Sequence, residues 1–266
     1  MEIFLDCLPC VLRQVLEASR MATDAPEIQA KIMEKSVMIL ADYKSYRCSP
    51  DIVKDMHQVV KRLTGVSDPY KTIKERDINA AKKVEPFLKH YLEQKQNELY
   101  WALKISATGN IIDSAIYSDI NIESSIEIEL AKEFSICDIS ALEEMLKTAK
   151  SILIIGDNAG ETVFDRVLIE YLAGYKITYA VRSEPIINDA TLQDAYDSGL
   201  YDYADIITTG CGAPGAVLNQ CSAEFLSAFN SADNVFSKGQ GNFEALSDCR
   251  RPVFFLLKAK CTMMAA

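Results

Sequence analysis

The chain has 266 residues, which is long enough to bury a sizeable core as one large domain or two modest ones. Its apolar share of 49% and charged share of 25% are those of an ordinary globular protein. The net charge is −10, from 38 acidic and 28 basic residues, which argues against a nucleic-acid-binding surface. An acidic chain can still bind a small anion, because a metal ion and a few basic side chains reverse the field inside one pocket.

The sequence also argues against a membrane protein. Its apolar runs are all shorter than the roughly 20 residues that a membrane span requires. The first residues include Glu2 and Asp6, where a secretory signal would be basic. We therefore expect a cytoplasmic protein with no membrane partner.

The eight cysteines are scattered along the chain, and reduced thiols are expected in that compartment. Only Cys7 and Cys10 have a suggestive spacing, as a Cys-x-x-Cys pair. They could be half of a zinc site, although two more ligands with matching spacing are not evident. They could instead be a redox pair with a lowered thiol pKa at a helix start, or have a structural role.

Residues 1–105 are expected to form a helical subdomain, because apolar residues recur there with the spacing of buried helix faces. A second helix is predicted after Pro26, and a third from Pro50 to a stop at Gly65. A long helical stretch follows, which Pro86 should break or kink.

Residues 106–266 are expected to form an α/β domain. Gly109 should interrupt the helical region, and an extended piece should follow at 111–113. Ser140 and Glu143 fit a helix capping box. Strands are predicted near 151–155, 177–182, 205–208, 234–237 and 253–257, with helical segments between most of them. This alternation predicts a mostly parallel, Rossmann-like sheet in a three-layer α/β/α arrangement.

The most informative stretch is ILIIGDNAGE, residues 152–161. Four apolar residues suit a strand buried on both faces, and a polar turn then leads into a helix with an apolar face. Ligands of such folds bind beyond the carboxyl ends of the strands. Asp157 and Asn158 stand at that end, and their oxygens suit a hard divalent cation.

Asp189 follows the next predicted strand, just after Asn188. Neighbouring strands of a sheet lie about 5 Å apart, so Asp189 could face Asp157 and complete a set of oxygen ligands. Asp189 could also be the N-cap of a helix over residues 190–198. One side chain can have both roles, and the sequence alone leaves both interpretations open.

A third polar turn, FSKGQGNFEAL, follows the fourth strand. Lys238 beside the exposed amides of Gly239 and Gly241 could cradle a phosphate, or the turn could be an ordinary surface turn. The loop 208–219 is also rich in glycine and stands at a strand end. Its Gly210, Gly212 and Gly215 could add amide donors, or the loop could be purely structural.

The three motifs, in this order and on these strands, resemble those of the damage-control phosphatase family, formerly family 89 of the domains of unknown function. The resemblance extends to CLPCVLRQ, DPYKTIK, ATGNIID and FFLLKAKC, and so to nearly the whole chain. The CLPC and DPYKTIK segments point to the prokaryotic branch, which has an N-terminal Cys-x-x-Cys.

The resemblance implies a metal-dependent phosphatase that acts on small phosphorylated metabolites, such as sugar phosphates. The family's metal ligands correspond to Asp157, Asn158 and Asp189, the same oxygen set that the strand ends suggest. The implied cofactor is a divalent ion, Mn²⁺, Ni²⁺, Co²⁺ or Mg²⁺. Asp157, Asn158 and Lys238 would be the catalytic residues.

The resemblance also implies a substrate pocket. The phosphate-contacting lysine of the family corresponds to Lys238, in a Lys-Gly-x-x-Asn-x-Glu motif that is intact through Glu244. The residues expected at the phosphate or substrate are Lys238, Gly239, Asn242, Glu161, Asn110 and Asp113.

Two mechanisms are open, and we favour water activated by the metal over attack by Asp157 through an aspartyl-phosphate. A non-catalytic metal or thiol sensor built on Cys7 and Cys10 is an alternative function. A dinucleotide enzyme or a carboxyl methyltransferase is less favoured, because GDNAG lacks the G-x-G-x-x-G spacing and its acidic residue would repel a pyrophosphate. The sequence does not predict an oligomeric state.

Overall fold

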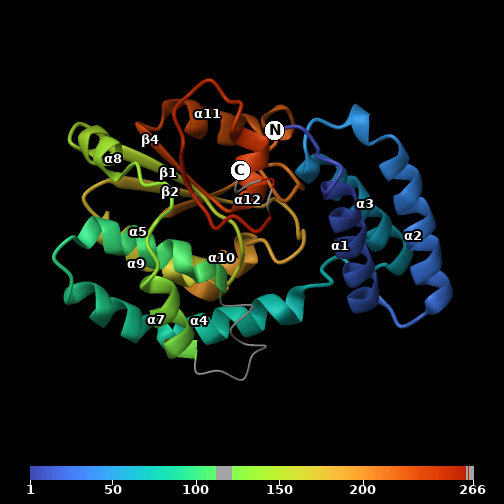
Figure 1. Ribbon diagram of the computed structural model, residues 1–266, viewed down its shortest axis with the longest axis horizontal. Helices are drawn as coiled ribbons and strands as arrows, with labels where there is room; N and C mark the ends of the chain where they lie inside the picture. The colour runs from blue at the N-terminus through green and yellow to red at the C-terminus, as the bar shows by residue number, and fades with distance from the viewer. Residues whose placement is uncertain (112–121, 262, 264–266) are drawn as a thin grey trace.

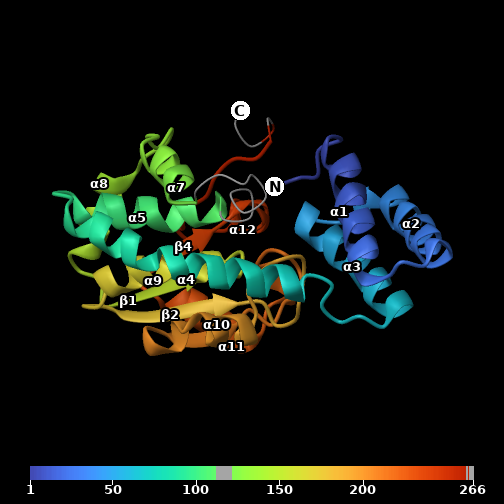
Figure 2. The same ribbon diagram turned by 90° about the horizontal axis from the view of Figure 1, so that it is seen from below.

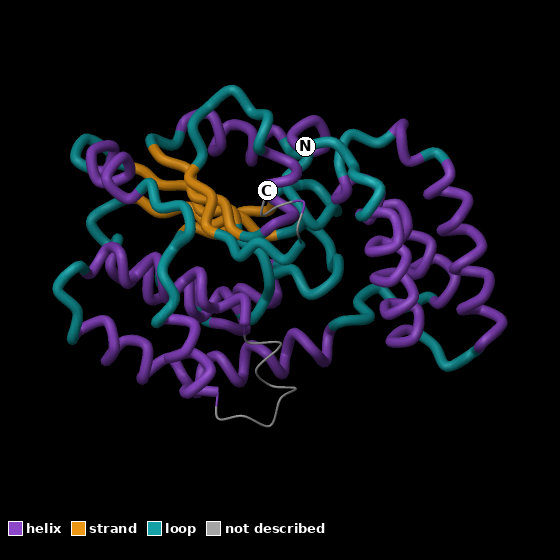
Figure 3. The backbone as a smooth tube through the Cα atoms, viewed as in Figure 1, coloured by secondary structure: helices purple, strands orange, loops and turns teal. Residues whose placement is uncertain are grey.

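The computed structural model describes residues 1–111, 122–261 and 263, and its centre is a five-stranded sheet in the order β3-β2-β1-β4-β5. All four strand pairs are parallel, so the predicted α/β fold with a parallel sheet is confirmed. Figure 3 shows the strands as one twisted layer. The strands are β1 (Ser151–Ile155), β2 (Lys176–Val181), β3 (Asp205–Thr208), β4 (Asn234–Lys238) and β5 (Phe254–Leu256).

The order of the strands determines where a ligand can bind. The chain runs outward from β1 through β2 to β3, then returns to the other side of β1 for β4 and β5. The direction of winding therefore changes between β1 and β4, where Ile155 pairs with Ser237. Open parallel sheets bind ligands at such a switch point, beyond the carboxyl ends of the strands.

The apolar run of β1 is explained by burial on both sides of the sheet. Ile152 and Ile154 belong to one hydrophobic cluster, whereas Leu153 and Ile155 belong to another. Figure 1 shows α4 (Lys71–Glu93), α5 (Glu98–Thr108) and α9 (Glu161–Tyr171) on one side of the sheet and α11 (Ala223–Ser231) and α12 (Gln240–Leu246) on the other. Continuous apolar strands are expected where helices cover both faces.

The helices of the α/β part are α7 (Ile122–Leu130), α8 (Ile139–Leu146), α9 (Glu161–Tyr171), α10 (Leu192–Ser198), α11 (Ala223–Ser231) and α12 (Gln240–Leu246). The helices that precede them are α1 (Cys7–Ala22), α2 (Pro26–Ala41), α3 (Ser49–Thr64), α4 (Lys71–Glu93) and α5 (Glu98–Thr108).

The first five helices belong to two different packed units. Helices α1, α2 and α3 share a core of their own, which includes Val15, Ile32 and Met56. Helices α4 and α5 instead pack on α9, and their apolar residues belong to the core on one face of the sheet. Figure 2 shows α1–α3 standing apart from the rest. The packing therefore divides the helical region before α4, although residues 1–105 were expected to form one subdomain.

The expected break at Pro86 is wrong, because α4 continues through it to Glu93. Pro86 lies on the exposed side, where water can bind the carbonyl that the missing N–H leaves free. The buried face of α4, including Ala81, Val84 and Leu88, packs on both sides of the proline. Tertiary packing thus keeps the helix continuous. The interruption comes after Glu93, and Asn97 caps α5.

Two expected caps are also wrong. Helix α8 begins at Ile139 with Asp138 as its N-cap, so Ser140 lies inside the helix. Helix α10 begins at Leu192, and Thr191 forms a capping box with Asp194. Asp189 is therefore not an N-cap. The predicted helix stop at Gly65 is confirmed, and α10 ends at Gly199.

Two further expectations concern the segment after α5 and the membrane. Ile111 ends a short 3₁₀ turn, Gly109–Ile111, and the rest of the expected extended piece lies outside the described residues. Within the described parts of the chain, every helix is too short or too polar to cross a membrane.

His57 provides a test of the packing of the unit that α1, α2 and α3 form, called the helical unit below. It lies in α3 with 3% of its surface exposed, and burial together with the charge of Lys61 lowers its pKa to about 4. In the unfolded chain this ring takes up a proton near pH 6.5, whereas in the folded chain it stays neutral down to about pH 4. The contribution of His57 to stability is therefore fully present above pH 6.5 and is lost as the pH falls toward 4. We expect the free energy of unfolding to fall by about 2 kcal/mol between pH 7 and pH 5 from this group.

Urea unfolding at the two pH values measures this effect. His57→Leu should remove the drop, and His90→Gln, at a ring with 69% of its side-chain surface exposed, should leave it in place. Equal pH dependence in all three proteins would contradict the assignment.

Candidate functional site

Two loops meet at the carboxyl edge of the sheet, one after β1 and one after β2. The N–H of Ala190 donates to the carbonyl of Asp157, and the N–H of Ala159 donates to the carbonyl of Asn188, both at 2.8 Å. These bonds flank an antiparallel bridge between Asn158 and Asp189. The predicted juxtaposition of Asp157 and Asn158 with Asp189 is therefore confirmed.

The loop after β2 is also held by the helical unit. Ile186 and Ile187 pack into the core of α1–α3. Ile187 has a φ of 47°, which is unusual for a β-branched residue and indicates local strain. The burial of Ile186 and the partial burial of Ile187 in a separate core offset this strain, and they fix the loop two residues before Asp189.

Gly239 determines where the Asp157 carboxylate lies. The glycine follows β4 with a φ of 78°, and a Cβ atom there would overlap the carboxylate of Asp157. A side chain at this position would therefore displace Asp157 as well as strain the backbone. The predicted turn after Lys238 thus meets the turn after β1.

The Asp157 carboxylate carries buried negative charge that is only partly balanced. It is 8% exposed, and its pKa is raised well above the ordinary range by burial and by the charges of Asp189 and Glu161. Arg182 and Lys260 act in the opposite direction. Arg182 is at the limit of an ion pair, with its Nη2 atom 3.9 Å from Asp157 Oδ1.

Arg182 is a site residue to which the sequence analysis gave no role. Its Nε donates to Asp189 Oδ2 at 2.6 Å, and its Nη1 donates to Asn242 Oδ1 at 3.1 Å. Among the described residues its Nη2 has no hydrogen-bond partner, although the side chain is 1% exposed. The sequence feature that could have predicted this role is the position of Arg182 directly after a buried strand, because a buried cation requires a buried anion as its partner.

Asn242 connects the ends of β1 and β4 rather than facing a substrate. It is fully buried, and its amide donates to the carbonyls of Gly156 and Lys238. Its Oδ1 accepts hydrogen bonds from Arg182 and from the N–H of Ala216. The protein itself therefore satisfies the side chain that was expected at the phosphate.

Lys238 is buried and paired, with 1% of its surface exposed. Its Nζ donates to the Ser106 carbonyl at 2.9 Å and to Asp165 Oδ1 at 2.6 Å, and lies 3.1 Å from Glu161 Oε2. These contacts occupy the three protons of the ammonium group. The interpretation as a surface turn is wrong, and Lys238 does not present a free charge to a phosphate in this structure.

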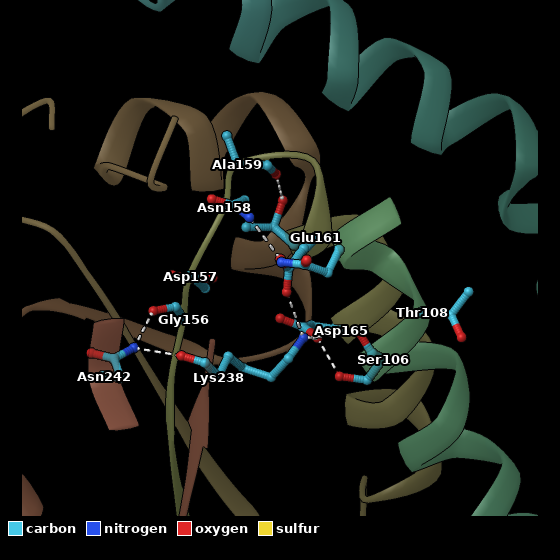
Figure 4. Close-up of polar contacts among 12 residues, drawn as sticks. Ser106, Thr108, Gly156, Asp157, Asn158, Ala159, Glu161, Asp165, Lys238 and Asn242 are labelled. Atoms are coloured by element: carbon cyan, nitrogen blue, oxygen red, sulfur yellow. Dashed lines mark hydrogen bonds and ion pairs between the residues drawn. The ribbon is translucent and has the colours of Figure 1, made fainter. Parts of the chain in front are cut away.

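Glu161 connects Lys238 with Asn158 of the candidate site, as Figure 4 shows. Its Oε1 accepts hydrogen bonds from the side-chain amides of Asn110 at 2.6 Å and Asn158 at 2.9 Å. The amide nitrogen of Asn158 is thus turned toward Glu161, which leaves its Oδ1 pointing away and available as a ligand. Asp113, expected beside Asn110, lies outside the described residues.

Asp165 supports Lys238 from α9 and was not predicted. Its Oδ1 accepts from Ser106 Oγ as well as from Lys238, and its Oδ2 accepts from the hydroxyl of Tyr179 at 2.7 Å. The side chain is fully buried. Its position one helical turn after Glu161 was the sequence signal, because residues four apart share a helix face.

The other glycines of the candidate loops are required by close packing. A Cβ atom on Gly212 would overlap the Glu184 carboxylate, and one on Gly215 would overlap the carbonyl of Gly241. Their role as amide donors to a phosphate stays a prediction.

Lys260 is a further cation, and no role was predicted for it. It is exposed, and its backbone N–H donates to Gln240 Oε1 at the start of α12.

The Cys-x-x-Cys pair lies at the start of α1, with Cys7 half-buried and Cys10 exposed, and both are free thiols. The pKa of Cys10 is raised by burial and then by Cys7, Cys261 and Glu244. The proposed lowering of a thiol pKa in this pair is therefore not supported for Cys10.

Within the described ranges, no group of three or more His, Cys, Asp or Glu side chains is arranged to bind a metal ion.

Comparison with known proteins identifies the family. A sequence model described as the damage-control phosphatase ARMT1-like domain matches residues 3–266, so the chain belongs to this family. A damage-control phosphatase of Pyrococcus horikoshii is 34% identical, over 100% of this chain and 93% of that protein. An uncharacterised protein of Methanocaldococcus jannaschii is 36% identical, over 98% of this chain and 90% of that protein.

The fold agrees with a solved structure. The crystal structure of a family 89 protein of Pyrococcus horikoshii matches with a TM-score of 0.91 at 33% sequence identity. The match covers 100% of this chain and 94% of that chain. The expected family membership is thereby confirmed across the whole length.

The buried cluster around Lys238 generates a stability prediction. Asp165→Asn would leave Lys238 with one anionic partner instead of two in a site that water does not reach. We expect a loss of about 3 kcal/mol in the free energy of unfolding, measured by urea denaturation. Glu170→Gln is the matched control, because its ion pair with Lys89 has the same 2.6 Å distance but about a third of each side chain exposed. The control should cost less than about 1 kcal/mol; equal losses would show that burial of the cluster is unimportant.

Proposed function

We propose that this protein is a metal-dependent phosphatase that hydrolyses small phosphorylated metabolites. The observation that carries the proposal is the meeting of Asp157, Asn158 and Asp189 at the switch point of the sheet, with unbalanced buried charge on Asp157. Family membership supports the same conclusion, as does the Pyrococcus horikoshii relative named a damage-control phosphatase.

The donor set fits a hard divalent cation such as Mn²⁺, Ni²⁺, Co²⁺ or Mg²⁺. Asp157, Asp189 Oδ1 and Asn158 Oδ1 would hold it, since Asp189 Oδ2 is engaged by Arg182 and the Asn158 amide nitrogen by Glu161. Two carboxylates and one amide leave positions for water and substrate oxygens. When bound, such an ion supplies Lewis acidity toward the phosphoryl group and lowers the pKa of a water molecule.

The remaining residues position the site and bind the substrate. Lys238 holds Glu161, and Glu161 in turn orients Asn158 and Asn110, so we assign Lys238 a positioning role. The exposed ammonium of Lys260 acts electrostatically on Asp157 and is the better candidate for contact with a phosphate dianion. The N–H of Gly239, which was expected at the phosphate, donates instead to the carbonyl of Leu256 at 3.2 Å.

We favour attack by water over attack by Asp157. The aspartyl-phosphate route requires Asp157 to give up one oxygen to phosphorus while the other serves the ion. The two routes differ in whether phosphate is found covalently on the protein during turnover. A reaction quenched in acid and then examined by mass spectrometry should show Asp157 unmodified; phosphate on Asp157 would establish the other route.

Metal-stripped protein should hydrolyse para-nitrophenyl phosphate only after one of the four ions is restored. Asp157→Asn should reduce that activity by more than the roughly 10- to 100-fold that loss of an outer-shell partner costs a metal site. Asp248→Asn, at an exposed carboxylate on the surface, is the control and should retain activity. Activity that survives in Asp157→Asn, or that needs no ion, would overturn the proposal.

The same substitution should stabilise the metal-free protein. A carboxyl group whose pKa is raised in the folded state stabilises the fold only while protonated, and that contribution is lost as the pH rises through the raised pKa. At pH 7.5, well above the pKa of an unfolded aspartate, the burial of Asp157 therefore opposes folding. The thermal midpoint of metal-free Asp157→Asn should exceed that of the parent, whereas a lower midpoint would show that the charge is balanced.

Lys260→Ala should raise the KM for the phosphate ester by roughly tenfold, as expected for loss of one charge-assisted hydrogen bond, with little change in kcat. Lys150→Ala is the control, because Lys150 precedes β1 at the opposite edge of the sheet. Steady-state kinetics separate the two parameters, and an unchanged KM in Lys260→Ala would remove Lys260 from the site.

A further inference from the structure

The loop after β3 brings two cysteines together at its base. The N–H of Ser222 donates to the carbonyl of Thr209 at 3.0 Å, which closes the loop. At the same point Gly210 has a φ of 71°, and a Cβ atom on it would lie 2.5 Å from Ser222 Cβ. Cys211 and Cys221 are the next residues inward from this contact, one on each side of the loop.

The two thiols converge on each other. The side chain of Cys221 lies in contact with that of Cys211. The Cys221 Sγ donates to the carbonyl of Val217 at 3.4 Å, and the Cys211 Sγ lies 3.9 Å from Gln220 Oε1. The Cys211 sulfur receives the backbone N–H groups of Ala213 and Val217. Both cysteines are free in the structure, and the pair has no part in the site described above.

The surroundings make the two thiols unequal. The hydrogen bond from Cys221, the two N–H groups and the charge of Arg182 lower the pKa of Cys211 to about 6, despite burial. The interaction with Cys211 and burial raise the pKa of Cys221. The surroundings therefore favour the thiolate form on Cys211 and the protonated thiol on Cys221. This is the arrangement of an attacking thiolate with a resolving thiol beside it.

We propose that Cys211 and Cys221 form an oxidation site that a small hydroperoxide converts into an intramolecular disulfide. Cys211 is 1% exposed and Cys221 is half-buried, so the geometry admits a small oxidant rather than a protein disulfide.

The chemistry balances in two steps. The Cys211 thiolate attacks one oxygen of the peroxide, the O–O bond breaks, and the products are a sulfenic acid on Cys211 and hydroxide. The Cys221 thiol then attacks that sulfur, forming the S–S bond and releasing water. The two sulfur atoms together lose two electrons, the peroxide gains them, and an external dithiol reverses the change.

Disulfide formation would also affect one contact with the candidate site and the contacts of Gln220 with α3. The N–H of Ala216, inside the loop, donates to Asn242 Oδ1 at 2.9 Å. Gln220, next to Cys221, accepts a hydrogen bond from Lys54 of α3 at 2.7 Å and donates to Asp51. Drawing Cys221 from the Val217 carbonyl toward Cys211 would disturb both, so we expect the oxidised chain to be less active.

The test treats the reduced full-length protein with one equivalent of hydrogen peroxide, followed by alkylation in denaturant and digestion with chymotrypsin. This protease can cleave after Leu218, so the two cysteines fall on separate peptides that only a disulfide joins. We expect the linked peptides to be the main product, at least about tenfold above oxidised Cys249, as thiolate-controlled reactivity predicts. Cys249 is the matched control, because it is half-buried and hydrogen-bonded to a carbonyl, that of Arg251.

Two variants identify the roles. Cys221→Ser should accumulate a dimedone-reactive sulfenic acid on Cys211, and Cys211→Ser should leave Cys221 unreacted. Free Cys211 and Cys221 in peroxide-treated parent protein, or a disulfide from either to another cysteine, would overturn the proposal without recourse to any variant.

A second readout is hydrolysis of para-nitrophenyl phosphate before oxidation, after oxidation and after reduction with a dithiol. This readout rests on the proposed phosphatase function, whereas the peptide map does not. A lower kcat that dithiol restores would support the coupling to the site. A mapped disulfide with unchanged activity would retain the oxidation site and reject the coupling.

Discussion

The site depends on how buried negative charge is balanced at the carboxyl edge of the sheet. Four carboxylates meet there, and two cations, Lys238 and Arg182, are buried with them. Lys238 balances Glu161 and Asp165, and Arg182 binds Asp189. Burying an unpaired charge is costly, so each of these pairs fixes the position of its members.

Asp157 is the member of this group whose charge is least compensated by the protein. Its contact with Arg182 is long, and Gly239 leaves the space that its carboxylate occupies. A carboxylate held in this state costs the fold stability, and it is the group on which the proposed metal site depends. In the same network the amide nitrogen of Asn158 donates to Glu161, so the Asn158 oxygen points away from Glu161. The network therefore fixes the orientation of a polar side chain as well as the positions of the charges.

The helical unit α1–α3 contributes by holding the loops, although the ligand groups of the proposed metal site come from the α/β part. Ile186 is buried in its core, and the side chains of Gln58 and Lys61 donate to Glu184. Lys54 binds Gln220 in the loop after β3. Two of the loops that border the site therefore depend on contacts with α3. Residues of α3, far away in the sequence, thus help to fix the positions of the site residues.

The sequence by itself determined the class of fold and the principal polar positions. Strand positions followed from short apolar runs, and Asp157, Asn158 and Asp189 could be placed together because parallel strands end at a common edge. Local patterns were misleading where packing outweighed them, as at Pro86, whose helix continues along a buried face, and at Asp189, which binds Arg182 instead of capping a helix. The tertiary structure alone decided which charges are paired. Lys238, Asp165 and Ser106 are far apart in the chain, and their mutual satisfaction depends on distances of a few ångströms that no local pattern encodes.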